Sequence, residues 1–203
     1  MDKENNQVQK PSVNKDNSLS GTVLLCLHDL VHLLAGILLV LLLLFRIVIV
    51  SGPSMNATLI DGDFLLLLSN IFYTEPQQGD IVVASKDSFK NGEPIIKRVI
   101  ATEGQEVDID FDAGIVYVDG TALTEAYTLT PTNLEEGMTF PMIVDEGCIF
   151  VMGDNRNMSK DSRNPEIGLI DKREVLGKAI VLLFPGTNGG LTQPQYTRIG
   201  VIS

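Results

Sequence analysis

Histidine is scarce in this chain of 203 residues, which contains only His28 and His32. Both lie in or at a long apolar run that ends before Ser54. A serine hydroxyl is a weak nucleophile at its ordinary pKa, and its usual base is a histidine within hydrogen-bond reach. The position of the two histidines therefore effectively excludes a Ser-His-Asp triad.

Basic residues and cysteines are also few. Fifteen Lys and Arg residues stand against 26 Asp and Glu residues, so the formal net charge is −11. This charge argues against nucleic acid, or an anionic membrane surface, as the main partner. Cys26 and Cys148 lie far apart, the first inside the apolar run, so the sequence implies no disulfide framework.

The longest apolar run of the chain has the length of a membrane span. Residues 33–50 contain a single charged residue, Arg46, and the hydrocarbon core of a bilayer needs about 20 apolar residues in a helix. The run is longer than the core of a cleaved signal peptide, and no Ala-x-Ala follows it. We therefore predict an uncleaved transmembrane anchor over residues 21–50, preceded by a polar tail over residues 1–20.

Two histidines fall at the start of this run. His28 and His32 are four residues apart, which places both on one helical face and is the spacing of a metal-binding pair. Because no third ligand is near them, we interpret them as polar residues of an interfacial first turn. The lysines and acidic residues of the tail balance each other, so the positive-inside rule does not fix the orientation of the anchor.

Short apolar runs separated by turn residues make up most of the chain after Met55. Such runs predict strands, and they lie at residues 64–68, 81–84, 95–101, 115–118, 148–152 and 175–183. Long amphipathic helices are not indicated there. We therefore predict a β-rich domain over residues 51–186 whose sheet coils on itself. Residues 187–203, rich in Gly, Gln and Thr, are expected to form a flexible tail.

A serine and a lysine are candidates for catalysis. Ser54 follows the apolar run in the sequence Ser-Gly-Pro-Ser-Met, and without a histidine its base must be a lysine whose pKa is lowered by burial. Lys97 is the best candidate because it lies mid-strand between apolar neighbours. Two plainer interpretations remain: Ser54 is an ordinary turn residue, and Lys97 points from its strand into solvent.

A dense group of polar residues over 153–163 directly follows an apolar strand. A solvated loop could have this composition. Short hydrogen-bonding side chains at a strand end are also what holds a buried ammonium group in place.

Together these segments resemble the sequence boxes of bacterial type I signal peptidases, which are Ser/Lys-dyad proteases of the membrane surface. Ser51 to Leu59 resembles the nucleophile box, and Lys97 to Ile100 resembles the general-base box. Residues 62–66 and 79–82 resemble two strand-forming boxes, and residues 153–163 the last one. Five boxes in the family's order, spread over most of residues 33–185, make the resemblance strong.

The resemblance implies a role for each matching residue. Ser54 would be the nucleophile and Lys97 its general base, with Ser159 orienting the lysine amine. Asp161 and Arg163 would form a supporting charged pair, while Gly153, Asp154, Asn155 and Arg156 would shape the loop beneath the dyad. The backbone N–H groups of Ser54 and Gly52 would hold the oxyanion. Shallow apolar pockets for small substrate side chains would be lined by Val48, Val50, Met55, Leu59, Ile95 and Ile96, for which plain core packing is the alternative.

For the whole chain, the resemblance implies a coiled antiparallel β domain, partly barrel-like, on one transmembrane helix. We expect a monomeric serine endopeptidase that cleaves signal peptides from exported preproteins, without a metal or cofactor and without nucleic acid. It would be anchored in the bilayer of a bacterial cell membrane with the catalytic domain outside the cytoplasm. The alternatives are a Ser/Lys autoprotease of the SOS repressor type, a scaffold without activity, and a peptidase dedicated to one surface-protein assembly.

Overall fold

The N-terminal apolar segment forms one helix, α1 (Lys15–Leu44), in the computed structural model, which describes residues 15–187 and 193–202. Within it, residues Gly21–Leu44 have the length and apolar composition needed to cross a membrane. The helix ends six residues before the predicted end of the anchor at Val50. Four β-branched residues, 47–50, follow there and favour an extended chain. The predicted first-turn position of His28 is wrong, because α1 begins at Lys15.

A compact β unit begins at Leu43. Its strands are β1 (Phe45–Ile49), β2 (Phe64–Ser69), β3 (Ile81–Ala84), β4 (Ile95–Thr102), β5 (Glu106–Asp110), β6 (Ile115–Val118), β7 (Thr121–Ala122), β8 (Met142–Ile143), β9 (Cys148–Met152), β10 (Ile170–Asp171), β11 (Val175–Phe184) and β12 (Gly200–Val201). Short 3-10 turns occur at η1 (Lys90–Gly92), η2 (Arg156–Met158), η3 (Lys172–Glu174) and η4 (Tyr196–Arg198). The predicted mainly β, coiled fold is confirmed.

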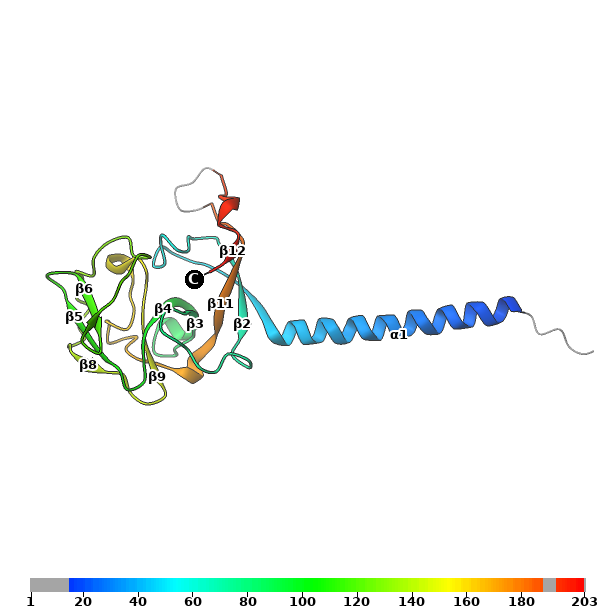
Figure 1. The fold of residues 1–203 in the computed structure, drawn as a ribbon, viewed down its shortest axis with the longest axis horizontal. Coiled ribbons are helices and arrows are strands. Elements are labelled where there is room, and N and C mark those ends of the chain that lie inside the picture. Colours follow the sequence, from blue (N-terminus) through cyan, green and yellow to red (C-terminus); the bar gives the residue numbers. More distant parts are fainter. Residues whose placement is uncertain (1–14, 188–192, 203) are drawn as a thin grey trace, which may run out of the picture. The chain divides into compact units, whose positions relative to one another are not determined.

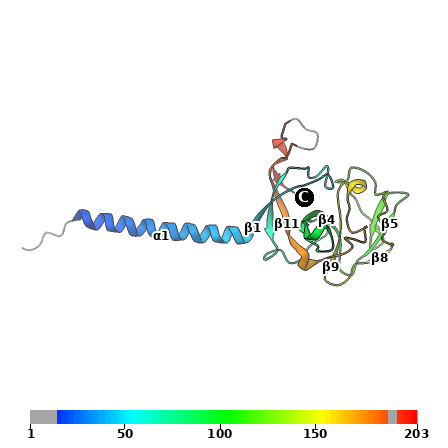
Figure 2. The ribbon, with the colours of Figure 1, turned by 180° about the vertical axis from the view of Figure 1, so that it is seen from behind.

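The strands form two antiparallel sheets. The larger has the order β1-β2-β11-β3-β4-β9-β10, with β12 added to β11, and the smaller has the order β7-β6-β5-β8. Register shifts in the pairings of β11 with β2 and β3, and of β4 with β9, bend the larger sheet. Figure 1 shows β5, β6 and β8 grouped at one side of the β unit and β2 and β11 at the other, and Figure 2 shows the same division from behind.

Three apolar clusters hold the β unit together. One lies under β1, β2 and β11, and includes Val50, Met55 and Leu59. A second packs residues of β3, β4, β9 and β10 with Phe89 and Ile167. The third joins the two sheets, with side chains of β4 and β9 against those of β5 and β6. The clusters fix β4 and β9, which carry the candidate site, between the other strands.

The C-terminal segment is partly ordered, contrary to the predicted flexible tail. Residues 193–202 include η4 and β12, and β12 pairs with β11. The Arg198 guanidinium makes two hydrogen bonds to the buried Asp63 carboxylate, at 2.9 and 2.6 Å. This ion pair and the strand pairing explain the order. Residues 188–192 and 203, like the predicted tail over 1–14, lie outside the described residues.

Candidate active site

The turn that carries Ser54 is closed by backbone pairing at its base. Val50 N–H donates to Asp63 O at 2.9 Å, and Gly62 N–H donates to Val50 O at the same distance. These bonds continue the hairpin of β1 and β2, so residues 51–61 form a connection fixed at both ends. Inside it, Met55 is buried and Ser54 is half-buried, which leaves its hydroxyl accessible beside the apolar core.

Lys97 comes from β4 and points into the β unit. The residue is only 5% exposed, and its Nζ lies 2.9 Å from Ser54 Oγ and 3.0 Å from Ile96 O. The solvent-facing interpretation of Lys97 is therefore wrong. Two residues that are 43 positions apart in sequence meet as a hydrogen-bonded pair.

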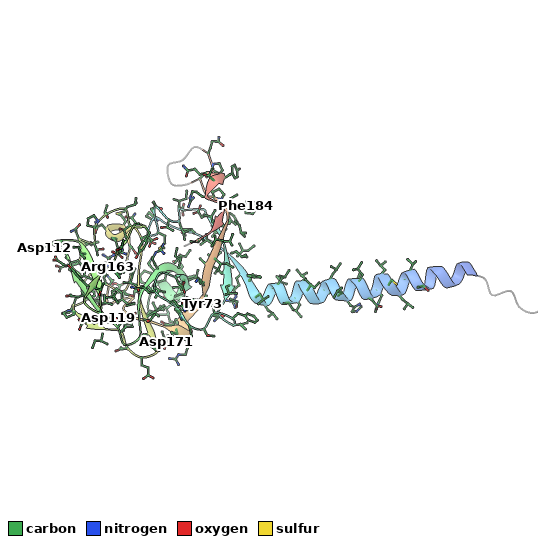
Figure 3. All side chains as sticks on the ribbon, in the orientation of Figure 1. Tyr73, Asp112, Asp119, Arg163, Asp171 and Phe184 are labelled. Atoms are coloured by element: carbon green, nitrogen blue, oxygen red, sulfur yellow. The ribbon has the colours of Figure 1, made fainter. Side chains whose placement is uncertain are left out.

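Most of the polar loop over 153–163 is buried, although Met158 and Lys160 are exposed. Asp161 and Arg163 are both fully buried and form a two-point ion pair, with Nε–Oδ1 and Nη2–Oδ2 distances of 2.8 and 2.9 Å. The same Asp161 carboxylate accepts the Gly153 N–H at 3.0 Å. Figure 3 shows Arg163 within the body of the β unit, whereas Asp112 and Asp119 lie at its outer edge. The pair thus braces the loop from within.

The loop also holds the Ser54 turn directly. Asn155 N–H donates to Ser54 O at 3.0 Å, and the Asn155 side-chain amide donates to Pro53 O at 3.1 Å. Asp154 binds Arg98, the neighbour of Lys97, through two hydrogen bonds of 2.9 Å. It also accepts a bond of 2.5 Å from Thr58 Oγ1. One loop therefore contacts both segments that supply the pair, the connection that carries Ser54 and strand β4.

Two expected details differ in the structure. Ser159 Oγ is buried and has no hydrogen-bond partner among the described residues, so the expected bond to Lys97 is not formed. The Gly52 N–H, expected at the oxyanion, donates instead to the Asp61 carboxylate at 2.9 Å. Gly52 has a φ of +89°, which a glycine adopts without strain. Within the described residues, the Ser54 N–H donates no hydrogen bond and remains the available donor.

A cavity of about 280 Å³ opens beside Ser54 and Lys97. Five of the six predicted pocket residues line it: Val48, Val50, Met55, Ile95 and Ile96. Leu59 does not, because it is fully buried in the core under β2. The lining also includes Phe89, Glu93 and Lys160, which sequence reasoning did not identify. A lining of apolar side chains with a few polar groups is typical of a binding cavity.

Comparison with known proteins identifies the family of the chain. A family model described as "Signal peptidase, peptidase S26" matches residues 24–184. The chain belongs to the signal peptidase family, peptidase S26. It is 37% identical over 185 residues to a signal peptidase I of Bacillus licheniformis, covering 87% of this chain and 95% of that protein.

Two further relatives support the assignment. The chain is 36% identical to a probable signal peptidase I-1 of Synechocystis sp., over 78% of this chain and 82% of that protein. It is 34% identical to signal peptidase I T of Bacillus subtilis, over 70% and 75%. A crystal structure of a signal peptidase I from Enterococcus faecalis aligns at 29% identity with a TM-score of 0.42, over 51% of this chain and 96% of that chain.

Family membership confirms the expected enzyme class, a serine peptidase of the signal peptidase I type. It also argues against an autoprotease of the SOS repressor type. Together with the single apolar helix found among the described residues, it indicates a membrane-anchored enzyme.

Several residues around the candidate site were not predicted from the sequence. Glu125, Tyr127 and Thr132 come from the segment between β7 and β8 and contact the arginines of the site. Local sequence patterns gave no signal for them, because each contact joins segments that are distant in sequence.

Proposed function

We propose that the chain is a signal peptidase I that cleaves signal peptides from exported preproteins with Ser54 as nucleophile and Lys97 as general base. The observation that carries the proposal is the 2.9 Å separation of Lys97 Nζ and Ser54 Oγ at a lysine that is 5% exposed. A lysine amine serves as a base when burial disfavours its charged form. The apolar strand around Lys97 supplies that environment.

The reaction follows from this contact. Lys97 accepts the Ser54 proton as Oγ attacks the scissile carbonyl carbon, and the ammonium group then protonates the leaving amine as the peptide bond breaks. The product is an ester between Ser54 and the signal peptide. Lys97 next takes a proton from water, and the hydroxide attacks the ester carbonyl carbon. The bond from that carbon to Ser54 Oγ breaks, and the proton passes from Lys97 to Oγ.

The negative oxygen of the intermediate needs hydrogen-bond donors. We assign this role to the Ser54 N–H, with Gly52 contributing only after its N–H leaves Asp61. Ser159 Oγ is a buried acceptor without a partner among the described residues, and a buried polar group of this kind normally finds one. We propose that Ser159 accepts an N–H from Lys97 once the lysine holds the Ser54 proton.

The substrate would lie extended beside β1, which forms the end of the larger sheet. Val48 and Ile49 of this strand, and Val50 directly after it, line the cavity. An extended peptide can pair with a free strand edge while its side chains enter pockets. The cavity volume of about 280 Å³ and its apolar lining favour small side chains such as alanine at the two specificity positions before the cut.

The same proposal covers location and organisation. Helix α1 would span a bacterial cell membrane once and hold the β unit at the outer, extracytoplasmic face, where a signal peptide leaves the lipid. The chain would then consist of a polar N-terminal tail, the membrane anchor, the peptidase domain and a C-terminal segment. Because every residue of the proposed site comes from one chain, a monomer suffices for catalysis.

The test is to express the full-length chain in membranes with a preprotein and to measure processing by gel shift. Ser54→Ala and Lys97→Ala are each expected to lose at least about 10³-fold in rate. Lys172→Ala is a matched control, because it removes a surface lysine whose partners, Glu75 and Glu103, lie outside the site. Unchanged processing by both dyad variants would refute the assignment.

A further inference from the structure

Two buried arginines flank the proposed dyad, and each is paired with a carboxylate. Arg98, next to Lys97 on β4, is 2% exposed and pairs with the fully buried Asp154. Arg156 is fully buried and binds Glu125 through bonds of 2.8 and 2.5 Å. Burial lowers the pKa of the Arg156 guanidinium, but the hydrogen bonds and charge of Glu125 outweigh this effect and raise it. Both arginines therefore depend on their partners.

Tyr127 lies against both ion pairs. Its ring lies 4.0 Å from Arg98 Cζ and 5.9 Å from Arg156 Cζ. Its hydroxyl donates to Glu125 Oε1 at 3.0 Å. Burial raises the pKa of Tyr127 to about 12, with the charge of Glu125 adding to the effect, so the hydroxyl stays protonated and can donate. The ring contributes a cation–π contact to Arg98 and limits access of water to its ion pair.

Glu125 and Tyr127 belong to a segment over residues 123–134, here named the clamp segment, between β7 and β8. The smaller sheet holds it, because Thr132 N–H donates to Gly114 O at 3.0 Å. The polar loop over 153–163, here named the catalytic loop, holds it from the other side through the Asn157 side chain, which contacts Thr130, Pro131, Asn133 and Leu134. Thr132 Oγ1 also accepts a bond of 2.9 Å from Arg156. The clamp segment thus joins the smaller sheet to the catalytic loop.

A continuous set of contacts leads from Tyr127 to the dyad. Arg98 is the chain neighbour of Lys97, and its carboxylate partner, Asp154, is the chain neighbour of Asn155. Asn155 in turn holds Ser54 O. The Arg98–Asp154 ion pair therefore connects the strand that carries the base to the loop that holds the nucleophile. A shift of this pair changes the separation of the two reacting groups.

We propose that Tyr127 and Glu125 are positioning residues that set the Ser54–Lys97 geometry through Arg98 and Arg156, and that the smaller sheet serves to present them. The inference rests on the proposed function, since positioning has a meaning only if the dyad is catalytic. Their contacts reach Ser54 and Lys97 through the two arginines and the catalytic loop. Their effect is on the turnover step, because these contacts lead to the dyad rather than to the cavity that would bind the substrate.

The experiment compares Tyr127→Leu, Tyr127→Phe and Glu125→Gln in the full-length chain in detergent, with a peptide substrate carrying alanine at both specificity positions. Tyr127→Leu removes the ring from Arg98 and is expected to lower kcat about tenfold with KM within about twofold. Tyr127→Phe keeps the ring and loses one hydroxyl bond, so it is expected to restore kcat to within about threefold of the parent. Glu125→Gln leaves Arg156 without its charge partner and is expected to resemble Tyr127→Leu.

Phe111→Leu is the matched control. The Phe111 side chain packs on Phe140 within the smaller-sheet core. Its backbone carbonyl, which the substitution retains, accepts a bond from Asn133 of the clamp segment. It is expected to lower the melting temperature as Tyr127→Leu does, while kcat stays within about twofold of the parent. Three results would each overturn the inference. Tyr127→Leu could retain the kcat of the parent, Phe111→Leu could lose as much kcat as Tyr127→Leu, or Tyr127→Leu could change KM alone. If the parent itself does not cleave, or Ser54→Ala cleaves as the parent does, the proposed function fails instead.

Discussion

Replacement of Gly153 by alanine tests whether the catalytic loop sets the position of the nucleophile. Gly153 follows β9, and a Cβ atom placed on it would overlap Ser159 Oγ and lie 2.5 Å from Ser54 O. The Ser159 hydroxyl can rotate away, but Ser159 Cβ, also at 2.5 Å, and Ser54 O move only with the backbone. An ordinary contact of about 3.4 Å therefore requires the Ser54 backbone to move by about 0.9 Å.

The size of the effect follows from that displacement. Lys97 Nζ and Ser54 Oγ are 2.9 Å apart, and a shift of about 1 Å away from the lysine takes them beyond hydrogen-bond distance. A misplacement of about 1 Å at a reacting group costs about 10²-fold in rate. We expect Gly153→Ala to lower kcat by about that factor. Overpacking should also lower the free energy of unfolding by about 1–3 kcal/mol.

The assay is peptide cleavage by the full-length chain in detergent, with near-UV circular dichroism to measure the folded fraction. Gly104→Ala is the control. Gly104 has a φ of +79°, and no atom lies within 4 Å of the point where an added Cβ would sit, so alanine costs backbone strain without steric contact. Two results would refute a role of this loop in positioning Ser54. Gly153→Ala could retain the kcat of the parent, or both variants could lose the same kcat after correction for the folded fraction.

Two further predictions concern stability. Arg198→Met leaves the buried Asp63 without its cation, so the free energy of unfolding should fall by about 2 kcal/mol. The melting temperature should fall by about 5 °C. An unchanged melting temperature would mean that this ion pair of the C-terminal segment does not contribute to stability. Burial, with the Asp161 charge adding to it, raises the pKa of the Glu136 carboxyl. The folded chain then binds its proton more tightly than the unfolded chain, so stability decreases as pH rises through the ordinary pKa of glutamate towards the raised value. Glu136→Gln lacks this loss, so its melting temperature relative to the parent should increase as pH rises above the ordinary pKa of glutamate. A difference that stays constant with pH would contradict the assignment.

The strands of the larger sheet were largely predictable because their apolar runs end at turn residues. β3, β4, β9 and β11 lie close to the predicted ranges. β5 was missed, although Val107 and Ile109 alternate with acidic residues and point into the core. The apolar run also hid the change from helix to strand near Leu44, since hydrophobicity alone does not distinguish a membrane helix from a buried strand.

The pairing of Ser54 with Lys97 could be proposed from residue types, because the lack of a suitable histidine left lysine as the base. The contacts that position the pair could not. Glu125 and Arg156 are 31 residues apart, and Arg198 and Asp63 are 135 apart. Such contacts depend on how two sheets and a C-terminal segment come together, which no local period or turn signal encodes.

The charges around the dyad indicate why this network is built as it is. Three buried arginines, Arg98, Arg156 and Arg163, are each held by one carboxylate, from Asp154, Glu125 and Asp161 respectively. The pairs balance, so the loop presents fixed geometry to Ser54 and Lys97 rather than a net charge. Removal of any one carboxylate leaves a buried arginine unpaired, which is costly and disturbs the bonds that its guanidinium makes to the loop. If Ser54 and Lys97 form the proposed dyad, its positioning depends on this connected network, which includes the clamp segment as well as the loop that resembles the family box.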